Sequence, residues 1–299
     1  MKYIENIREV NDFFGIESQH PLIDIRRFSD IIPDKPREIE PMTFDFYKIS
    51  FVQNFNGYLK YGKAKFTGKD GVLYFVEPGQ QYSCTSTNKI EGYQILIHPD
   101  IYKKYLSEKN IKSYSFFSYD INESLLLTKE EEDSVSSLMQ EACEEMNNMK
   151  DDFSIPIVLS YVATLLNKTE RFYARQFSNR KVMCNQLSSD FFKLLKSYYQ
   201  NKSTFSDKEQ PSVLHFANKL NVTPNYLSDT IKHHSGRSAL NIIHDYIIEE
   251  AKTLLKTSSQ TVSEISYILG FEYPNYFSRL FKKKTKLSPS DFRKSVKSI

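Results

Sequence analysis

The sequence contains two nearly identical segments, and this internal repeat constrains the fold more than any other feature. "PNYLSDTIKHH" runs from Pro224 to His234, and "PNYFSRLFKKK" runs from Pro274 to Lys284, 50 residues later. The match extends upstream, so that about residues 212–236 align with about residues 261–286, with one extra residue in the turn of the second copy. Two copies at a fixed spacing predict one supersecondary unit used twice.

Each copy predicts two short helices joined by a tight turn. A small residue in the first helix, Ala217 or Ser266, allows the two helices to cross closely. A proline, Pro224 or Pro274, stands at the start of the second helix, where its missing N–H costs nothing. This is the spacing of a helix-turn-helix unit. A single such pattern is a weak signal, but two in tandem are a much stronger one.

A long apolar stripe separates the two copies. The segment "LNIIHDYIIEEAKTLLKTSSQ" repeats apolar residues at helical spacing and predicts a rigid helix that holds the units apart. We therefore expect the second helix of each unit, 224–234 and 274–284, to enter successive major grooves of DNA, about 34 Å apart along the duplex. We call these two segments the reading helices. One monomer would then place two helices in successive major grooves, which usually requires a symmetric dimer.

Polar side chains on the outer face of the reading helices have the chemistry for reading DNA. Asn can bind adenine with two hydrogen bonds, Arg can bind guanine in the same way, and Lys can hold phosphate. We expect phosphate contacts at Lys232, His233, Arg237, Lys282, Lys283 and Lys284.

The charge of the chain is divided in a way that fits this interpretation. From Pro211 onward there are 13 Lys or Arg and 7 Asp or Glu, a net charge of +6, whereas the residues before it carry 27 and 30, a net charge of −3. A basic domain joined to a mildly acidic one is typical of a nucleic-acid-binding module with a separate sensing or assembly module. A solvated basic face that arose by chance is the alternative.

Residues 211–294 resemble the DNA-binding domain of the AraC/XylS family of transcriptional regulators. The match includes "EEAKTLL", "SEISYILGFEYPNYFSRLFKK" and the closing "SPSDFR". The resemblance implies a sequence-specific transcription regulator that binds double-stranded DNA and has RNA polymerase as a partner. It also implies base contacts at Asn225, Ser228, Asp229, Asn275, Ser278 and Arg279.

Two positions depart from the pattern of that family. Asp229 stands where members often have Arg; phosphate repels it, but it could accept a hydrogen bond from cytosine. We therefore expect the second unit to carry more of the affinity. Lys286 stands where the family usually has Gly, as Gly236 does in the first copy, so we expect a different cap at that helix end.

The rest of the chain predicts an α+β organisation with an N-terminal β-rich region. Residues 1–127 contain short alternating segments and turns, which favour an antiparallel sandwich or barrel. Residues 128–200 predict helices, and the polar segment 201–211 reads as the linker to the DNA-binding domain at 212–299. The order of these parts loosely resembles the cupin-like sensor and dimerisation region of many family members. The helices have surplus apolar surface, which fits either a homodimer or internal packing.

Candidates for small-molecule chemistry are few. If the sheet closes, Phe44, Phe46, Tyr74 and Phe75 could line an effector pocket, although ordinary core packing is the favoured interpretation of these residues.

His20 and His98 lie far apart and the three cysteines are widely spaced, so we expect no metal, no cofactor and no enzyme. The start of the chain lacks an apolar signal segment, and we expect a cytoplasmic protein without a membrane span. A non-specific architectural DNA binder and a cupin-type enzyme are the rival functions.

Overall fold

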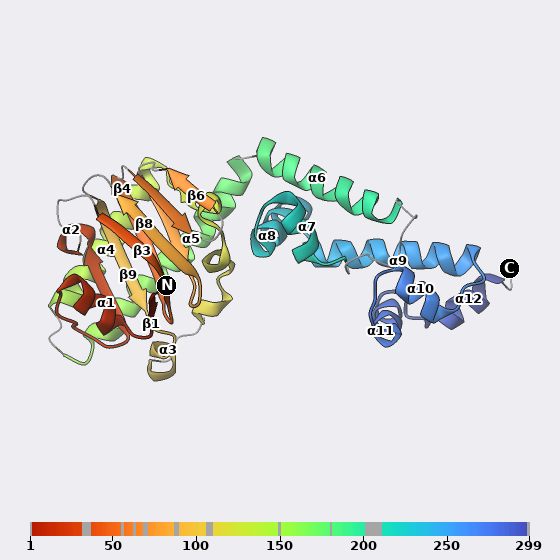
Figure 1. The fold of residues 1–299 in the computed structure, drawn as a ribbon, viewed down its shortest axis with the longest axis horizontal. Coiled ribbons are helices and arrows are strands. Elements are labelled where there is room, and N and C mark those ends of the chain that lie inside the picture. Colours follow the sequence, from red (N-terminus) through yellow and green to blue (C-terminus); the bar gives the residue numbers. More distant parts are fainter. Residues whose placement is uncertain are drawn as a thin grey trace. The chain divides into compact units, whose positions relative to one another are not determined.

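The computed structural model describes residues 2–31, 37–54, 57–61, 64–67, 71–86, 90–105, 110–148, 151–179, 181–200 and 211–297. The chain forms two compact units, Met1–Asn179 and Arg180–Ile299. Figure 1 shows sheets with helices in the N-terminal unit, Met1–Asn179, and the helices of the C-terminal unit, Arg180–Ile299. Within the described residues, no helix combines the length and the apolar character needed to cross a membrane.

Two five-stranded sheets build the N-terminal unit, in the orders β1-β3-β8-β5-β6 and β10-β7-β4-β9-β2. Among the described strands, β1 and β3 are parallel and the other pairs are antiparallel. The strands are β1 (Lys2–Ile4), β2 (Ile23–Arg27), β3 (Arg37–Phe44), β4 (Tyr47–Asn54), β5 (Gly57–Tyr61), β6 (Ala64–Thr67), β7 (Val72–Val76), β8 (Gln81–Ser86), β9 (Glu91–Ile97) and β10 (Leu125–Leu126). The mixed helix and sheet class is confirmed, but the described strands form two sheets and no closed barrel.

The apolar core of this unit draws on both sheets. Phe44 and Tyr82 come from one sheet, and Tyr74, Val76 and Leu96 come from the other, all in a single buried cluster. Because side chains alternate along a strand, every second residue of β7 belongs to this cluster. The unit is therefore a two-layer sandwich, which is the other arrangement that the strand pattern favoured.

Helices complete the N-terminal unit. They are α1 (Ile7–Phe14), α2 (Phe28–Ile31), α3 (Ile101–Lys104), the short 3-10 turns η1 (Ile111–Ser113), η2 (Ser115–Ser118) and η3 (Ile121–Glu123), and the long α4 (Lys129–Asn147) and α5 (Ser154–Asn179). Thr128 caps α4, because its hydroxyl accepts from the Glu131 N–H at 3.3 Å while the Glu131 carboxylate accepts from the Thr128 N–H at 3.0 Å. Helices α4 and α5 pack on each other, and α4 also packs on β2 and β9.

The C-terminal unit is all-helical in its described residues. It contains α6 (Lys181–Gln200), α7 (Val213–Leu220), α8 (Pro224–Ser235), α9 (Ala239–Thr257), α10 (Val262–Ile268), α11 (Pro274–Thr285) and α12 (Pro289–Lys297). Helix α9 lies between the pair α7–α8 and the pair α10–α11 and packs on all four helices (Figure 1). The predicted separating helix is therefore present, and its buried stripe includes Ile243, Ile247, Ala251 and Leu255.

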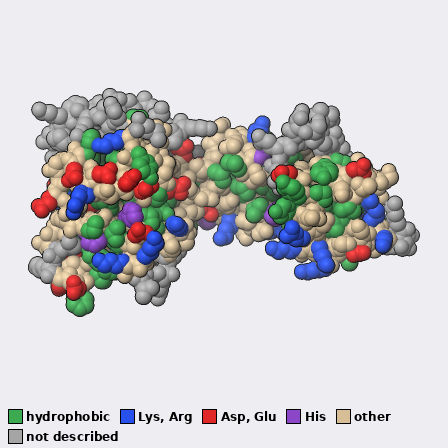
Figure 2. Space-filling view, turned by 60° about the horizontal axis from the view of Figure 1, so that its bottom comes forward, with side chains coloured by type: hydrophobic (Ala, Val, Ile, Leu, Met, Phe, Trp, Pro, Cys, Tyr) green, Lys and Arg blue, Asp and Glu red, His purple; other side chains and the backbone are tan. Residues whose placement is uncertain are grey.

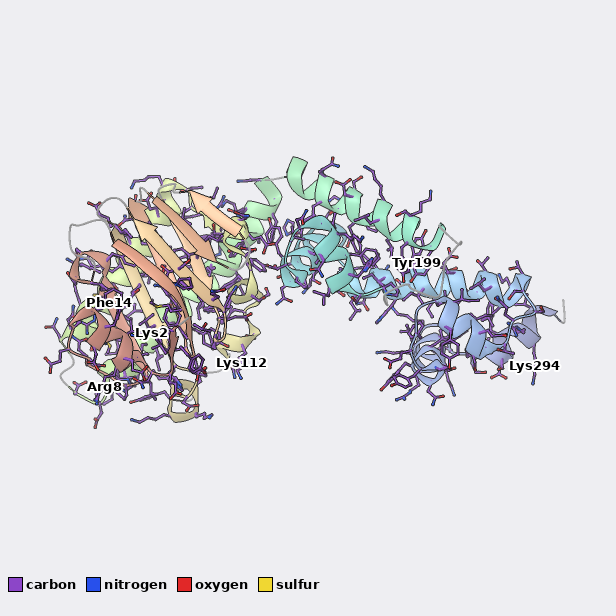
Figure 3. All side chains as sticks on the ribbon, in the orientation of Figure 1. Lys2, Arg8, Phe14, Lys112, Tyr199 and Lys294 are labelled. Atoms are coloured by element: carbon purple, nitrogen blue, oxygen red, sulfur yellow. The ribbon has the colours of Figure 1, made fainter. Side chains whose placement is uncertain are left out.

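Helix α6 packs within the C-terminal unit. Phe191, Leu195 and Tyr199, spaced four residues apart, join the buried cluster of α7 to α11. Tyr199 lies between α6 and α9, where its ring stacks on that of Tyr246 with centroids 5.4 Å apart (Figure 3). The helices of the 128–200 region are thus divided, since α4 and α5 pack with the sheets and α6 with the repeat. Residues 201–210 of the predicted linker lie outside the described residues, and dimerisation through this region stays a prediction.

Candidate DNA interface

The two repeated segments fold into matching helix pairs. Helix α7 packs on α8, and α10 packs on α11. The small residues expected at the crossings, Ala217 and Ser266, are fully buried. Since any larger side chain there would push the helices apart, these two positions fix the close approach within each unit.

Each reading helix has a buried face and an outer face. Leu227 and Ile231 in α8, like Phe277 and Phe281 in α11, are completely buried. The residues proposed to contact bases lie away from this core: Asn225, Asn275 and Arg279 are exposed, and Ser228, Asp229 and Ser278 are half-buried. The fold brings the six residues onto the outer faces of two helices, and their contact with bases stays a prediction.

The two reading helices end in the same way, which corrects the expectation for Lys286. Gly236 has φ 72°, and Lys286 has φ 68°, so both adopt the left-handed conformation. The N–H of each donates to the carbonyl four residues earlier, on Lys232 or Lys282, at 2.8 Å. The prediction of a different cap was therefore wrong. The backbone geometry of the repeat is kept, and lysine takes on the strain that glycine avoids.

One carboxylate on the separating helix binds two of the residues predicted to hold phosphate. The Lys284 ammonium lies 2.8 Å from Asp245 Oδ1. Arg237, which follows the first reading helix, donates to Asp245 Oδ2. Both cations therefore have an ion-pair partner within the protein. Asp245 was not singled out from the sequence, because a lone acid in an apolar helical stripe resembles an ordinary solvated residue.

The remaining predicted phosphate-binding residues lie on the surface. Lys232, His233, Lys282 and Lys283 are all exposed. Figure 2 shows basic side chains gathered along the lower edge of the C-terminal unit, in the region of α11. The exposed cations beside the second reading helix would attract an anionic backbone.

A pair of repeated tyrosines has different surroundings in the two units. Tyr226 and Tyr276 occupy equivalent places in the reading helices, yet Tyr226 is 8% exposed and Tyr276 is 58% exposed. Helix α8 packs on α6, α7 and α9, whereas α11 packs on α9, α10 and α12. The repeated sequence alone could not separate the two tyrosines, because the helices that flank the two units differ.

The four residues proposed for an effector pocket do not share one space. Phe44, Phe46 and Tyr74 belong to the core between the sheets. Phe75 follows Tyr74 on β7 and points the other way, where its ring lies 4.5 Å from that of Phe116. Alternation along the strand separates neighbouring residues onto opposite faces, so Phe75 does not line any pocket that contains the other three.

The two N-terminal histidines make local hydrogen bonds. His20 Nδ1 accepts from the Leu22 N–H at 3.2 Å, and burial together with Lys104 lowers the pKa of His20. His98 Nδ1 accepts from the Asp100 N–H at 3.2 Å. Among the residues whose placement is described, no cluster of three His, Cys, Asp or Glu side chains could hold a metal ion.

Comparisons with known proteins match the C-terminal part of the chain. A family described as a helix-turn-helix domain matches residues 216–295. The raffinose operon transcriptional regulatory protein of Pediococcus pentosaceus is 32% identical over 127 residues, 42% of this chain and 43% of that protein. The arabinose operon regulatory protein of Escherichia coli is 39% identical over 72 residues, 24% of this chain and 25% of that protein.

A solved structure is similar to part of the chain. The C-terminal domain of AraT, a response regulator from Geobacillus stearothermophilus, is 28% identical, with 35% of this chain and 84% of that chain covered and a TM-score of 0.31. The chain spans less than half the length of the curated relatives that it matches. The sequence matches, placed on the tandem helix pairs, identify residues 216–295 as an AraC-type helix-turn-helix domain.

Proposed function

We propose that this chain is a transcription regulator that binds DNA at specific sequences through α8 and α11. The observation that carries the proposal is the pair of matching helix-turn-helix units on one separating helix, each with polar side chains on its outer face. Regulators among the relatives share this part of the chain. By the same relationship, we extend the proposal to RNA polymerase as a partner and to action in the cytoplasm, and we assign no chemical reaction to the chain.

The alternative is an architectural DNA-binding protein that has little sequence preference. Such a protein would use the basic edge of the C-terminal unit and would not need amide and guanidinium groups on two reading helices. A specific regulator prefers its site over random DNA by a factor of at least about 1,000 at physiological salt. Competition between a selected duplex and a scrambled duplex of equal length measures this ratio for the full chain. A ratio near one would refute the proposal.

For the N-terminal unit, we propose a cupin-like sensor and dimerisation role. The support is its double-layer sheet with an aromatic core and the exposed apolar side chains of Phe153 and Ile157 at the start of α5. A small-molecule effector would bind in this unit and change the DNA affinity of the other. Sedimentation of the full chain should give twice the monomer mass, and Phe153→Ser with Ile157→Ser should return it to the monomer mass. Monomers at all concentrations would refute the dimer.

A further inference from the structure

The second reading helix carries exposed aromatic surface at its beginning. Tyr276 is the third residue of α11 and is 58% exposed, and Tyr273, directly before the helix, is 55% exposed. The two rings pack edge to face, with centroids 5.8 Å apart. Residues in the first turn of a reading helix are the ones that reach base edges in helix-turn-helix proteins. An aromatic side chain at this place would therefore face the floor of the major groove.

Tyr276 is also joined to the residue that we assign to guanine. The guanidinium carbon of Arg279 lies 5.1 Å from the centre of the Tyr276 ring, which is within the range of a cation–π contact. The stacking restrains both side chains before DNA binds, so less conformational entropy is lost on binding. Tyr276 and Arg279 consequently act as one preformed surface, with an apolar part next to a hydrogen-bonding part.

The helix would be better capped without an aromatic residue at 273. In the first unit, the equivalent Thr223 accepts a hydrogen bond from the Tyr226 N–H at 3.3 Å and caps α8. Tyr273 makes no such bond for α11. The neighbouring Glu272 carboxylate raises the pKa of Tyr273. The local fold would favour Thr at 273, since a capping hydroxyl stabilises a helix, and the tyrosine instead supports the Tyr276 ring.

We propose that Tyr276, supported by Tyr273, forms a binding subsite for the methyl group of a thymine next to the guanine bound by Arg279. The thymine methyl is the apolar group that base pairs present in the major groove, and apolar side chains recognise it by contact. The polar residues expected from the sequence do not supply this contact. The inference rests on the proposed function, because it assumes that α11 lies in the major groove.

Uracil substitution tests the subsite in the full-length chain. A duplex selected by the wild-type protein is remade with deoxyuridine in place of each thymine in turn, which removes one methyl group and no hydrogen bond. One position in the box bound by the second unit should weaken binding about four-fold, the value for burying a single methyl-sized group. For Tyr276→Ala, replacing thymine with uracil at that position should not change the affinity. For Tyr276→Phe, the replacement should weaken binding as it does for the wild type, because the ring makes the contact.

Two further variants separate the subsite from stability. Tyr267→Ala removes a tyrosine on α10 that is 55% exposed and should leave every uracil effect unchanged. Tyr273→Thr restores the capping residue of the first unit, so it should unfold at higher denaturant concentration while the uracil effect shrinks. Unchanged uracil effects in Tyr276→Ala would overturn the inference, as would a wild-type protein that prefers a sequence but tolerates uracil at every position. A wild-type protein without sequence preference would instead refute the proposed function itself.

Discussion

The Lys284 ammonium lies 2.8 Å from Asp245 Oδ1 and joins the second reading helix to the helix that separates the two units. The same carboxylate accepts from Arg237 at the end of the first unit. A single acid thus connects both helix-turn-helix units to α9. It also neutralises positive charge beside the surface that we propose for DNA.

Replacing Asp245 should strengthen DNA binding while weakening the fold. In Asp245→Asn, Arg237 and Lys284 lose their carboxylate and become available to phosphate, so non-specific affinity should rise. The plot of log affinity against log salt concentration should steepen by about one for each new phosphate contact. The pairs are partly exposed, and the stability lost should stay at or below about 1 kcal/mol. Salt titrations on a random duplex make the comparison, and an unchanged slope with unchanged affinity would contradict it.

Lys286→Gly should stabilise the C-terminal unit. Lys286 holds a left-handed backbone conformation, which costs a residue with a side chain about 1 kcal/mol relative to glycine. The free energy of unfolding should rise by about that amount in urea titrations. Gly236→Ala is the matched control, since its added methyl would meet no atom within 4 Å, and it should lose a similar amount through backbone strain alone. A destabilised Lys286→Gly variant would mean that the lysine side chain has a separate stabilising role.

Arg279 and Lys282 on α11 should have different roles, Arg279 in contact with a base and Lys282 in contact with phosphate. Arg279→Ala should lose about 1 to 3 kcal/mol on the preferred site and relax the preference at one base pair, as expected for a base contact. Lys282→Ala should weaken all sequences alike and flatten the salt slope by about one. Affinities of both variants on single-substitution duplexes separate the roles. Equal losses on every duplex for Arg279→Ala would remove it from the base contacts.

His244 should make the C-terminal unit less stable in mild acid. Burial, with Lys284 and Lys283 nearby, lowers the pKa of His244 below its usual 6.5. Between pH 6.5 and the lower pKa of the folded state, His244 is protonated in the unfolded chain but largely neutral in the folded chain. The free energy of unfolding therefore falls as the pH drops through this range. His244→Gln should show a shallower fall across this range. An NMR titration that gives His244 a pKa of 6.5 or more would contradict the prediction.

The two helix-turn-helix units could be predicted from the sequence, because interactions within each helix pair determine their fold. Small residues at 217 and 266 and prolines at 224 and 274 act within one helix pair, and the structure places them as expected. The Lys286 prediction was wrong because the cap geometry is imposed by the whole unit rather than by the residue. Tertiary packing overrode a local preference there.

Other features depend on long-range packing that a single pattern cannot reveal. The stripe of Phe191, Leu195 and Tyr199 shows that α6 has an apolar face, but not that the face belongs with α7 and α9. Tyr276 is exposed and the equivalent Tyr226 is buried, a difference that the repeated sequence does not show. Tyr74 and Phe75 were grouped by composition, although strand alternation alone sends them to opposite faces.

Selection of bound duplexes from a random library of about 40 base pairs, with the full-length protein at physiological salt, tests whether α8 and α11 recognise DNA bases. We expect two short enriched boxes for each monomer, separated centre to centre by about one helical turn. Thymine beside guanine should recur in the box bound by the second unit. Retained binding without any enriched sequence would contradict the claim that the two reading helices recognise DNA bases.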